Sequence, residues 1–112
     1  AQQLLSHLNE TDSKAISLLA IDTQQQAKPF YCVLFEGNIH HSVDHEYIDS
    51  ILRQNFHYEL ARNLGQLDQP QIRQANNGWA AYKKLVMSDG LIEGNIKPEP
   101  LKKITLNSLE RL

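Results

Sequence analysis

The sequence predicts one α+β domain, in which a small mixed or antiparallel sheet of three to four strands is flanked by two to three helices. The chain has 112 residues, which is the length of a single domain. It is 41% hydrophobic and 21% charged, as ordinary globular domains are. Strand-like and helix-like segments follow one another in the order α-β-β-α-β-α-β. Short chains that mix the two in this way usually form one sheet with helices packed on it.

The first three elements are a short helix and a hairpin. A helix is expected at residues 2–8, where three leucines recur at helical spacing. Turn-forming residues then interrupt the chain, and two β-prone runs follow at 15–23 and 30–36. The second run is the clearest strand, because it has six consecutive apolar residues and is stopped by Gly37. Since a polar loop joins the two runs, we expect an antiparallel hairpin.

The best helical pattern spans residues 43–65. Apolar side chains recur there along one face, and acidic residues gather in the first turn, where the helix dipole favours them. Ser42 and Asp44 are both candidates for the N-cap. Gly65 is a natural stop.

The remaining elements are shorter. A third strand is expected at 70–75 and a second amphipathic helix at 76–90, which ends at Gly90. Trp79 could stack on a ligand, but an anchor between this helix and the sheet is the favoured interpretation. Residues 101–112 are compatible with a last strand, a short helix, or both.

Composition and charge exclude several classes of function. The net charge is −2, so nucleic-acid binding is not indicated. No apolar stretch approaches the length of a membrane span. Eight of the 11 Lys and Arg residues lie in 61–112, which would receive an anionic group better than the first half. The single cysteine, Cys32, excludes an internal disulfide; it suits a small buried side chain and the reduced cytoplasm.

Two groups of polar residues invite a functional interpretation. His40, His41 and His45 lie close together, and the last two have the i, i+4 spacing of zinc ligands on one helical turn. The spacing matches no known metal signature and part of it precedes the helix, so a solvated loop and helix start is favoured, while a metal site at these histidines stays open as an alternative. The second is Glu36 alone, at the end of the strongest strand. It is either a functional carboxylate at a sheet edge or a surface acid that ends the strand.

A face of the expected helix at 43–65 carries Asn55, Tyr58 and Arg62 at i, i+3 and i+7. A polar rim beside the core, with Arg62 bonded to the helix end or a nearby loop, is favoured over direct catalysis. The chain contains no glycine-rich phosphate loop, no nucleophile elbow and no cysteine pair with metal spacing. The residues alone therefore indicate a domain that completes the site of a larger protein, or a binding module.

Four motifs occur in order over roughly residues 1–101. They are the strand "KPFYCVLFEG", the helix with Ile48-Asp49, Leu52, Asn55, Tyr58 and Arg62, the Pro70, Ile72 and Gly78-Trp79 series, and "GNIKPEP" at Gly94–Pro100. Together they resemble the small C-terminal domain of the auxin-responsive (Gretchen Hagen type) acyl-acid amido synthetases and their bacterial relatives. The chain departs from that family at Glu99-Pro100, where the family tends to have arginine after the proline, and it lacks the large N-terminal domain.

The resemblance implies an adenylate-forming, ATP-binding ligase of the cytoplasm. Such enzymes join a small carboxylic acid to ATP, giving an acyl-adenylate and pyrophosphate, and an amino acid then displaces AMP to form an amide. Residues 1–112 would be the mobile C-terminal domain of the parent enzyme and inactive in isolation. ATP and Mg²⁺ would be held through the large N-terminal adenylation domain, which is the expected partner. Neither nucleic acid nor a membrane is expected to bind.

The resemblance also points to particular residues. Lys97 would be the catalytic and cofactor-binding residue, in contact with phosphate or adenylate, while Tyr58 and Arg62 would hold the domain in register against its partner. An ammonium that arrives only in the closed state would stabilise the negative charge that builds on the phosphate. Two alternatives stay open: Lys97 is a solvated surface charge, or the chain is a non-enzymatic α+β module that binds a protein partner or small ligand.

Overall fold

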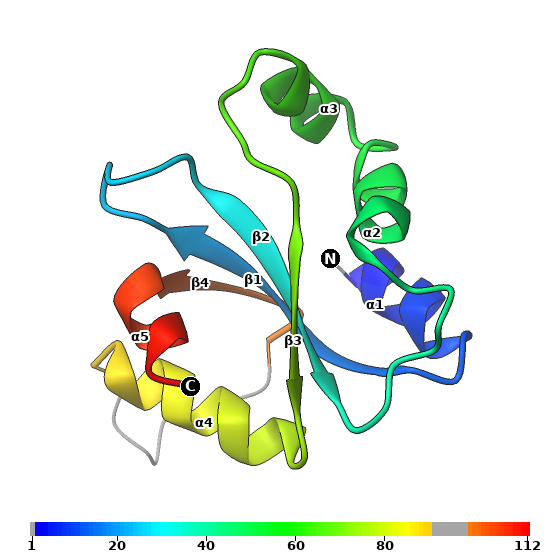
Figure 1. Cartoon of the computed structure of the whole chain (residues 1–112), viewed down its shortest axis with the longest axis vertical. Helices are drawn as coiled ribbons and strands as arrows, with labels where there is room; N and C mark the ends of the chain where they lie inside the picture. The colour runs from blue at the N-terminus through cyan, green and yellow to red at the C-terminus, as the bar shows by residue number, and fades with distance from the viewer. Residues whose placement is uncertain (1, 91–98) are drawn as a thin grey trace.

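The computed structural model describes residues 2–90 and 99–112 and shows a four-stranded sheet with helices on both faces (Figure 1). The strands are β1 (Lys14–Asp22), β2 (Phe30–Glu36), β3 (Gln71–Ala75) and β4 (Leu101–Thr105). They lie in the order β3-β2-β1-β4. The predicted α+β class, with a small sheet of three to four strands, is confirmed.

The sheet is mixed. Strands β1 and β2 form the predicted antiparallel hairpin, with Lys14 opposite Glu36 at one end and Ile21 opposite Phe30 at the other. Strand β3 pairs with β2 in parallel, and β4 pairs with β1 in parallel. Parallel neighbours need crossover connections, so each edge strand is reached through helices that cover the sheet.

Five helices lie in the described residues: α1 (Gln2–Asn9), α2 (His45–Leu52), α3 (Phe56–Asn63), α4 (Gly78–Ser88) and α5 (Leu106–Glu110). The number exceeds the two to three expected, partly because the segment 43–65 forms two helices and not one. The break is at Asn55, whose backbone is extended and whose side-chain oxygen accepts the Tyr58 N–H at 3.1 Å. Asparagine competes in this way with the helical backbone bonds and so begins a new helix.

The other helix ends follow the same capping chemistry. Asp44 is the N-cap of α2, since its carboxylate accepts the Tyr47 N–H at 2.8 Å. The last segment, for which a strand and a helix were both possible, contains both: β4 leads directly into α5, which Thr105 caps. No helix in the described part of the chain combines the length and the apolar character that a membrane crossing requires.

Strand β2 carries both halves of the core, because successive side chains of a strand point to opposite faces. Cys32 and Leu34 face the layer of α4 and α5, whereas Val33 and Phe35 face α1 and α2, and all four are fully buried. Burial raises the pKa of the Cys32 thiol to about 12. The thiol therefore stays protonated and serves as a small apolar side chain, as its place in an apolar run predicted.

Candidate functional site

Lys97 lies outside the described residues, but the chain is described on both sides of its segment. On the N-terminal side, Gly90 follows α4 with a φ of 101°, in the left-handed region that favours glycine. The neighbouring Asp89 carboxylate accepts the Thr105 backbone N–H at 3.1 Å and the Thr105 hydroxyl at 2.8 Å. The Ser108 hydroxyl donates to it as well. These bonds tie the end of α4 to β4 and α5.

The C-terminal junction is held by buried side chains. The Ser17 hydroxyl donates to the carbonyl oxygen of Glu99 at 2.7 Å, and the Glu99 N–H donates to the Tyr82 hydroxyl at 3.2 Å. The Leu18 N–H donates to the carbonyl of Pro100 at 2.8 Å. Since Ser17 and Tyr82 are both buried, the point at which the chain enters β4 is fixed to the sheet and to α4.

Tyr58 and Arg62, the two residues predicted to position the domain, converge on Asp49. Arg62 Nε donates to Asp49 Oδ1 at 2.9 Å, and the Tyr58 hydroxyl donates to the same oxygen. Arg53 Nε donates to Oδ2 at 2.8 Å. Arg62 also donates to the carbonyl oxygen of Leu67 at 3.2 Å, so its expected bond to a nearby loop is confirmed. These contacts join α2, α3 and the loop after α3.

The charge of Asp49 is well stabilised. Burial would raise the pKa of this carboxyl, but the hydrogen bonds from Arg62, Tyr58 and Arg53 outweigh burial and lower the pKa to about 2. Asp49 is therefore ionised at neutral pH, and its two oxygens are engaged within the domain. The arrangement suits a structural joint better than proton transfer. Asp49 was not predicted as a site residue, although its i, i+4 spacing from Arg53 was the available signal.

The contacts of Glu36 favour a surface acid with a structural role over a functional carboxylate. Its carboxylate accepts a hydrogen bond from the Lys14 ammonium at 2.7 Å. It accepts another, also at 2.7 Å, from the Gly78 N–H at the start of α4. The hydrogen bond from Lys14 and then that from Gly78 lower the pKa of Glu36. A side chain at Gly78 would place its Cβ 2.5 Å from Ile16 Cγ1, so glycine allows α4 to begin this close to the sheet.

The histidine cluster does not form a metal centre in the described part of the chain. No group of three or more His, Cys, Asp or Glu side chains there could hold an ion. The rings of His40 and His41 stack with 4.3 Å between centroids, and His40 Nδ1 lies 2.7 Å from the Ser42 hydroxyl. His45 is the first residue of α2. These contacts describe the loop before α2.

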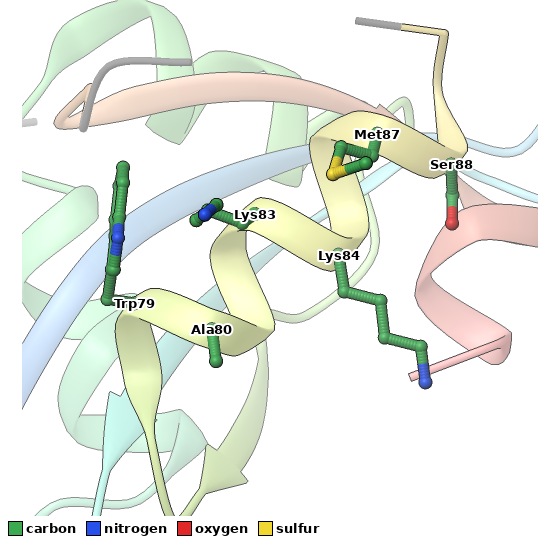
Figure 2. Close-up of a pocket in the computed structure, with 6 residues that line it drawn as sticks. All are labelled: Trp79, Ala80, Lys83, Lys84, Met87 and Ser88. Atoms are coloured by element: carbon green, nitrogen blue, oxygen red, sulfur yellow. The ribbon is translucent and has the colours of Figure 1, made fainter. Parts of the chain in front are cut away.

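A shallow hollow of about 550 Å³ lies on the outer face of α4 (Figure 2). Trp79 stands at one end of it, stacked on Tyr82 with 5.8 Å between ring centroids. The Lys83 ammonium is 6.0 Å from the centroid of the indole, whereas Lys84 points away from that ring. We assign no ligand to this hollow. Its lining residues are Trp79, Ala80, Lys83, Lys84, Met87 and Ser88.

The expectation that Trp79 anchors the helix to the sheet is wrong. The side chain is 40% exposed, while Ala81, Tyr82, Leu85 and Val86 form the buried face of α4. The physical reason is its angular position. The centre of that face lies between Leu85 and Tyr82, so Trp79 falls at the edge of the stripe, beyond Val86, and turns outward.

The exposure of Trp79 predicts an optical property, because it is the chain's one tryptophan. We expect acrylamide to quench the fluorescence of the folded chain clearly, though less efficiently than that of the urea-unfolded chain, since Trp79 is 40% exposed. Stern–Volmer titrations of both states check this. Strong shielding in the folded chain would instead place Trp79 in a covered position.

A line of exposed apolar side chains on α3 was also missed by sequence reasoning. Phe56 is 71% exposed, Leu60 44% and Leu64, at the C-cap, 61%. We call these three residues the α3 stripe. Their i, i+4, i+8 spacing was visible in the sequence, but the segment was interpreted as one helix whose apolar face points to the core.

No family model, curated protein or solved structure matches the chain. Among the described residues the structure brings Tyr58 and Arg62 together at Asp49 and ties both junctions of the Lys97 segment to the fold. It also leaves two exposed surfaces, the α4 hollow and the α3 stripe.

Proposed function

We propose that the chain is the mobile C-terminal domain of an ATP-dependent acyl-acid amido synthetase-like ligase of the auxin-responsive type. The parent enzyme would convert a small carboxylic acid and ATP to an acyl-adenylate and pyrophosphate. The nitrogen of an amino acid would then attack the acyl carbon, forming the amide and releasing AMP. The ordered motifs from "KPFYCVLFEG" to "GNIKPEP" support this assignment. The isolated domain would be inactive.

The observation that carries the proposal is the fixing of both junctions of the Lys97 segment. Asp89 ties the end of α4 to Thr105 and Ser108, and Ser17 with Tyr82 holds the backbone of Glu99. A lysine that serves a site in another domain has to arrive at a repeatable position when the domains close. A segment whose two ends are bonded to the core of its own domain meets that requirement.

In the first half-reaction a carboxylate oxygen attacks the α-phosphorus of ATP, and the bond to the leaving pyrophosphate breaks. Negative charge accumulates on the phosphate oxygens in this step. We assign to Lys97 the contact with those oxygens, because an ammonium brought in by closure stabilises the transition state more than the resting state. The adenylation domain would bind the nucleotide and Mg²⁺.

Other residues are compatible with a small domain that acts on a site in a larger one. Tyr58 and Arg62 would act in domain positioning indirectly, by holding α3 through Asp49. The buried, protonated thiol of Cys32 suits the reducing cytoplasm, in which we place the parent enzyme. The acid and amine substrates would bind mostly to the adenylation domain.

Replacing Lys97 by alanine in the parent polypeptide tests the assignment. We expect acid-dependent pyrophosphate exchange into ATP to fall about 100-fold, as for other single groups that stabilise transition-state charge. Lys97→Arg should retain part of the activity, because the charge is kept while the geometry changes. Lys103→Ala, at an exposed lysine of β4, is the matched control and should stay near wild type.

The outcomes separate two kinds of failure. Exchange near the wild-type rate in the Lys97→Ala enzyme would overturn the catalytic role of Lys97 alone. If the wild-type polypeptide shows no exchange with any of a panel of carboxylic acids, or if no adenylation domain precedes these residues in the natural polypeptide, the proposed function itself is wrong.

A further inference from the structure

A cleft of about 730 Å³ separates α3 from the sheet face that α1 and α2 cover. Of the eight residues of α3, only Tyr58 is buried, and its hydroxyl is bonded to Asp49 of α2. Helix α3 is therefore held largely by polar contacts, and it stands off from the sheet. Because protein interiors normally leave few voids larger than a water molecule, a cleft of this size in so small a domain indicates an occupant.

The floor and much of the walls of the cleft are apolar. Leu18 of β1 and Leu101 of β4 lie opposite each other in the sheet and form part of the floor. Leu4 of α1 and Leu52 of α2 contribute to the walls. Leu101 is 48% exposed, so the cleft opens to solvent beside β4. A mostly apolar hollow enclosed by several elements is typical of small-molecule sites, which usually measure about 300–1,000 Å³.

Two aromatic rings line the cleft. Tyr31 of β2 and Tyr58 of α3 lie with 5.9 Å between their ring centroids and an angle of 46° between their planes. The Tyr58 hydroxyl is already bonded to Asp49, so this residue offers its ring and not its polar end. Flat aromatic molecules pack well on tilted rings, in offset or edge-to-face arrangements. The pair therefore favours an aromatic ligand over a flexible aliphatic one.

The polar side chains of the cleft are amides and imidazoles. No Asp, Glu, Lys or Arg is among the described residues that line it. Gln3 and His7 of α1 and Gln54 and His57 near the start of α3 line it and are exposed, which places them at the rim. Amide and imidazole groups donate and accept hydrogen bonds. A charged ligand would lose water here without gaining an ion pair, so an uncharged polar group fits better.

We infer that this cleft binds a small, flat, uncharged aromatic molecule with one hydrogen-bonding group, comparable in size to a naphthol. The rings of Tyr31 and Tyr58 contact its aromatic body, and the amides and imidazoles of the rim bind its polar group. This binding site is separate from the nucleotide chemistry assigned to Lys97. It goes beyond the proposed function and does not depend on it.

Titration of the 112-residue chain with 2-naphthol at neutral pH, followed by two-dimensional amide NMR spectra, tests the inference. We expect a Kd on the order of 0.1–1 mM, which is ordinary for a ligand of about ten non-hydrogen atoms. The amide shifts should be largest around Tyr31, Leu52 and Ala61, which line the cleft. The anion 2-naphthoate has the same rings and should bind at least about tenfold more weakly, because its carboxylate finds no ion partner.

Two variants locate the site. Ala61→Phe fills the cleft from α3 and should weaken 2-naphthol binding at least about tenfold, whereas its control Ala80→Phe, on the outer face of α4, should stay within about twofold of wild type. Leu101→Ala shortens an exposed side chain of the floor and should weaken binding about threefold even if Ala61→Phe fails to fold. Met87→Ala is its control, because Met87 is 44% exposed and Leu101 48%.

Several results would overturn the inference. Shifts centred on α4 would place the ligand in the α4 hollow, and shifts centred on the α3 stripe would indicate an unspecific apolar contact. Equal affinity for 2-naphthoate would rule out an uncharged ligand class. No saturable shift up to about 3 mM, or undiminished binding to the Leu101→Ala chain, would show that the cleft is not the binding site. Pyrophosphate exchange by the parent enzyme, which tests the proposed function, is unaffected by any of these outcomes.

Discussion

Replacing Phe35 by alanine is expected to lower the free energy of unfolding by about 4 kcal/mol, the usual cost of removing a buried phenyl ring. Phe35 is fully buried on β2, in the cluster that holds α1 and α2 on the sheet. Small domains have total stabilities of about 5–15 kcal/mol, so the variant should be close to unfolding. Urea denaturation of the 112-residue chain, followed by far-UV circular dichroism, measures the effect.

The same substitution at Phe56 is the matched control. Phe56 is 71% exposed, so its replacement by alanine should change the free energy of unfolding by less than about 0.5 kcal/mol in the isolated chain. Leu34→Ala, on the opposite face of β2, should cost about 3 kcal/mol. Similar small losses at Phe35 and Phe56 would contradict the placement of Phe35 between the sheet and its helices.

Replacing Asp49 by alanine is the second large effect, with an expected loss of about 3 kcal/mol. The change removes the acceptor of Arg62, Tyr58 and Arg53 together and leaves partly buried donors without their carboxylate. Tyr58→Phe removes a single hydrogen bond and should cost about 1 kcal/mol. Urea denaturation at pH 7 gives both values.

The pH dependence of the unfolding free energy tests whether the contribution of Asp49 requires its ionised carboxylate. The folded-state pKa of Asp49 is about 2, below its ordinary value. A group with a lowered folded pKa contributes stability that is present above its unfolded pKa of about 4 and is lost as pH falls toward the folded value. The difference in unfolding free energy between wild type and Asp49→Ala should therefore shrink between about pH 4 and 2.

Asp68→Ala is the control for both Asp49 experiments, because Asp68 is exposed in the loop after α3. Its effect at pH 7 should be within about 0.5 kcal/mol. If the stabilities of wild type and Asp49→Ala differ by the same amount from pH 4 to pH 2, the Asp49 carboxylate does not titrate as its contacts require.

Elements with a strong local signal could be predicted from the sequence. The β1–β2 hairpin was predictable because apolar β-prone runs flank a polar loop, and both ends of α4 because Asn77 caps it and Gly90 follows it. The division at Asn55 was not predicted, since the helical period of its apolar neighbours continues through it. The outcome depends on whether that one side chain accepts a backbone N–H, which periodicity does not report.

The candidate site was less predictable, since it depends on contacts between distant residues. Tyr58 and Arg62 were selected, but their common acceptor Asp49 is nine and 13 residues away in sequence. The anchors of the Lys97 segment are more distant still, since Ser17 bonds to Glu99 across 82 residues. Such pairs follow from the sheet order, and the order of strands in a sheet is not encoded in any local pattern.

That sheet order also has a consequence for how the chain folds during synthesis. The central strand β1 takes its second partner from the C-terminal end, with Leu18 opposite Leu101. Until β4 emerges from the ribosome, one side of β1 has unpaired N–H and C=O groups beside the apolar Leu19 and Ile21. Open edges of this kind recruit other strands, so chains that end before residue 101 should aggregate. Addition of β4 covers this side of β1, which then lies between two strands.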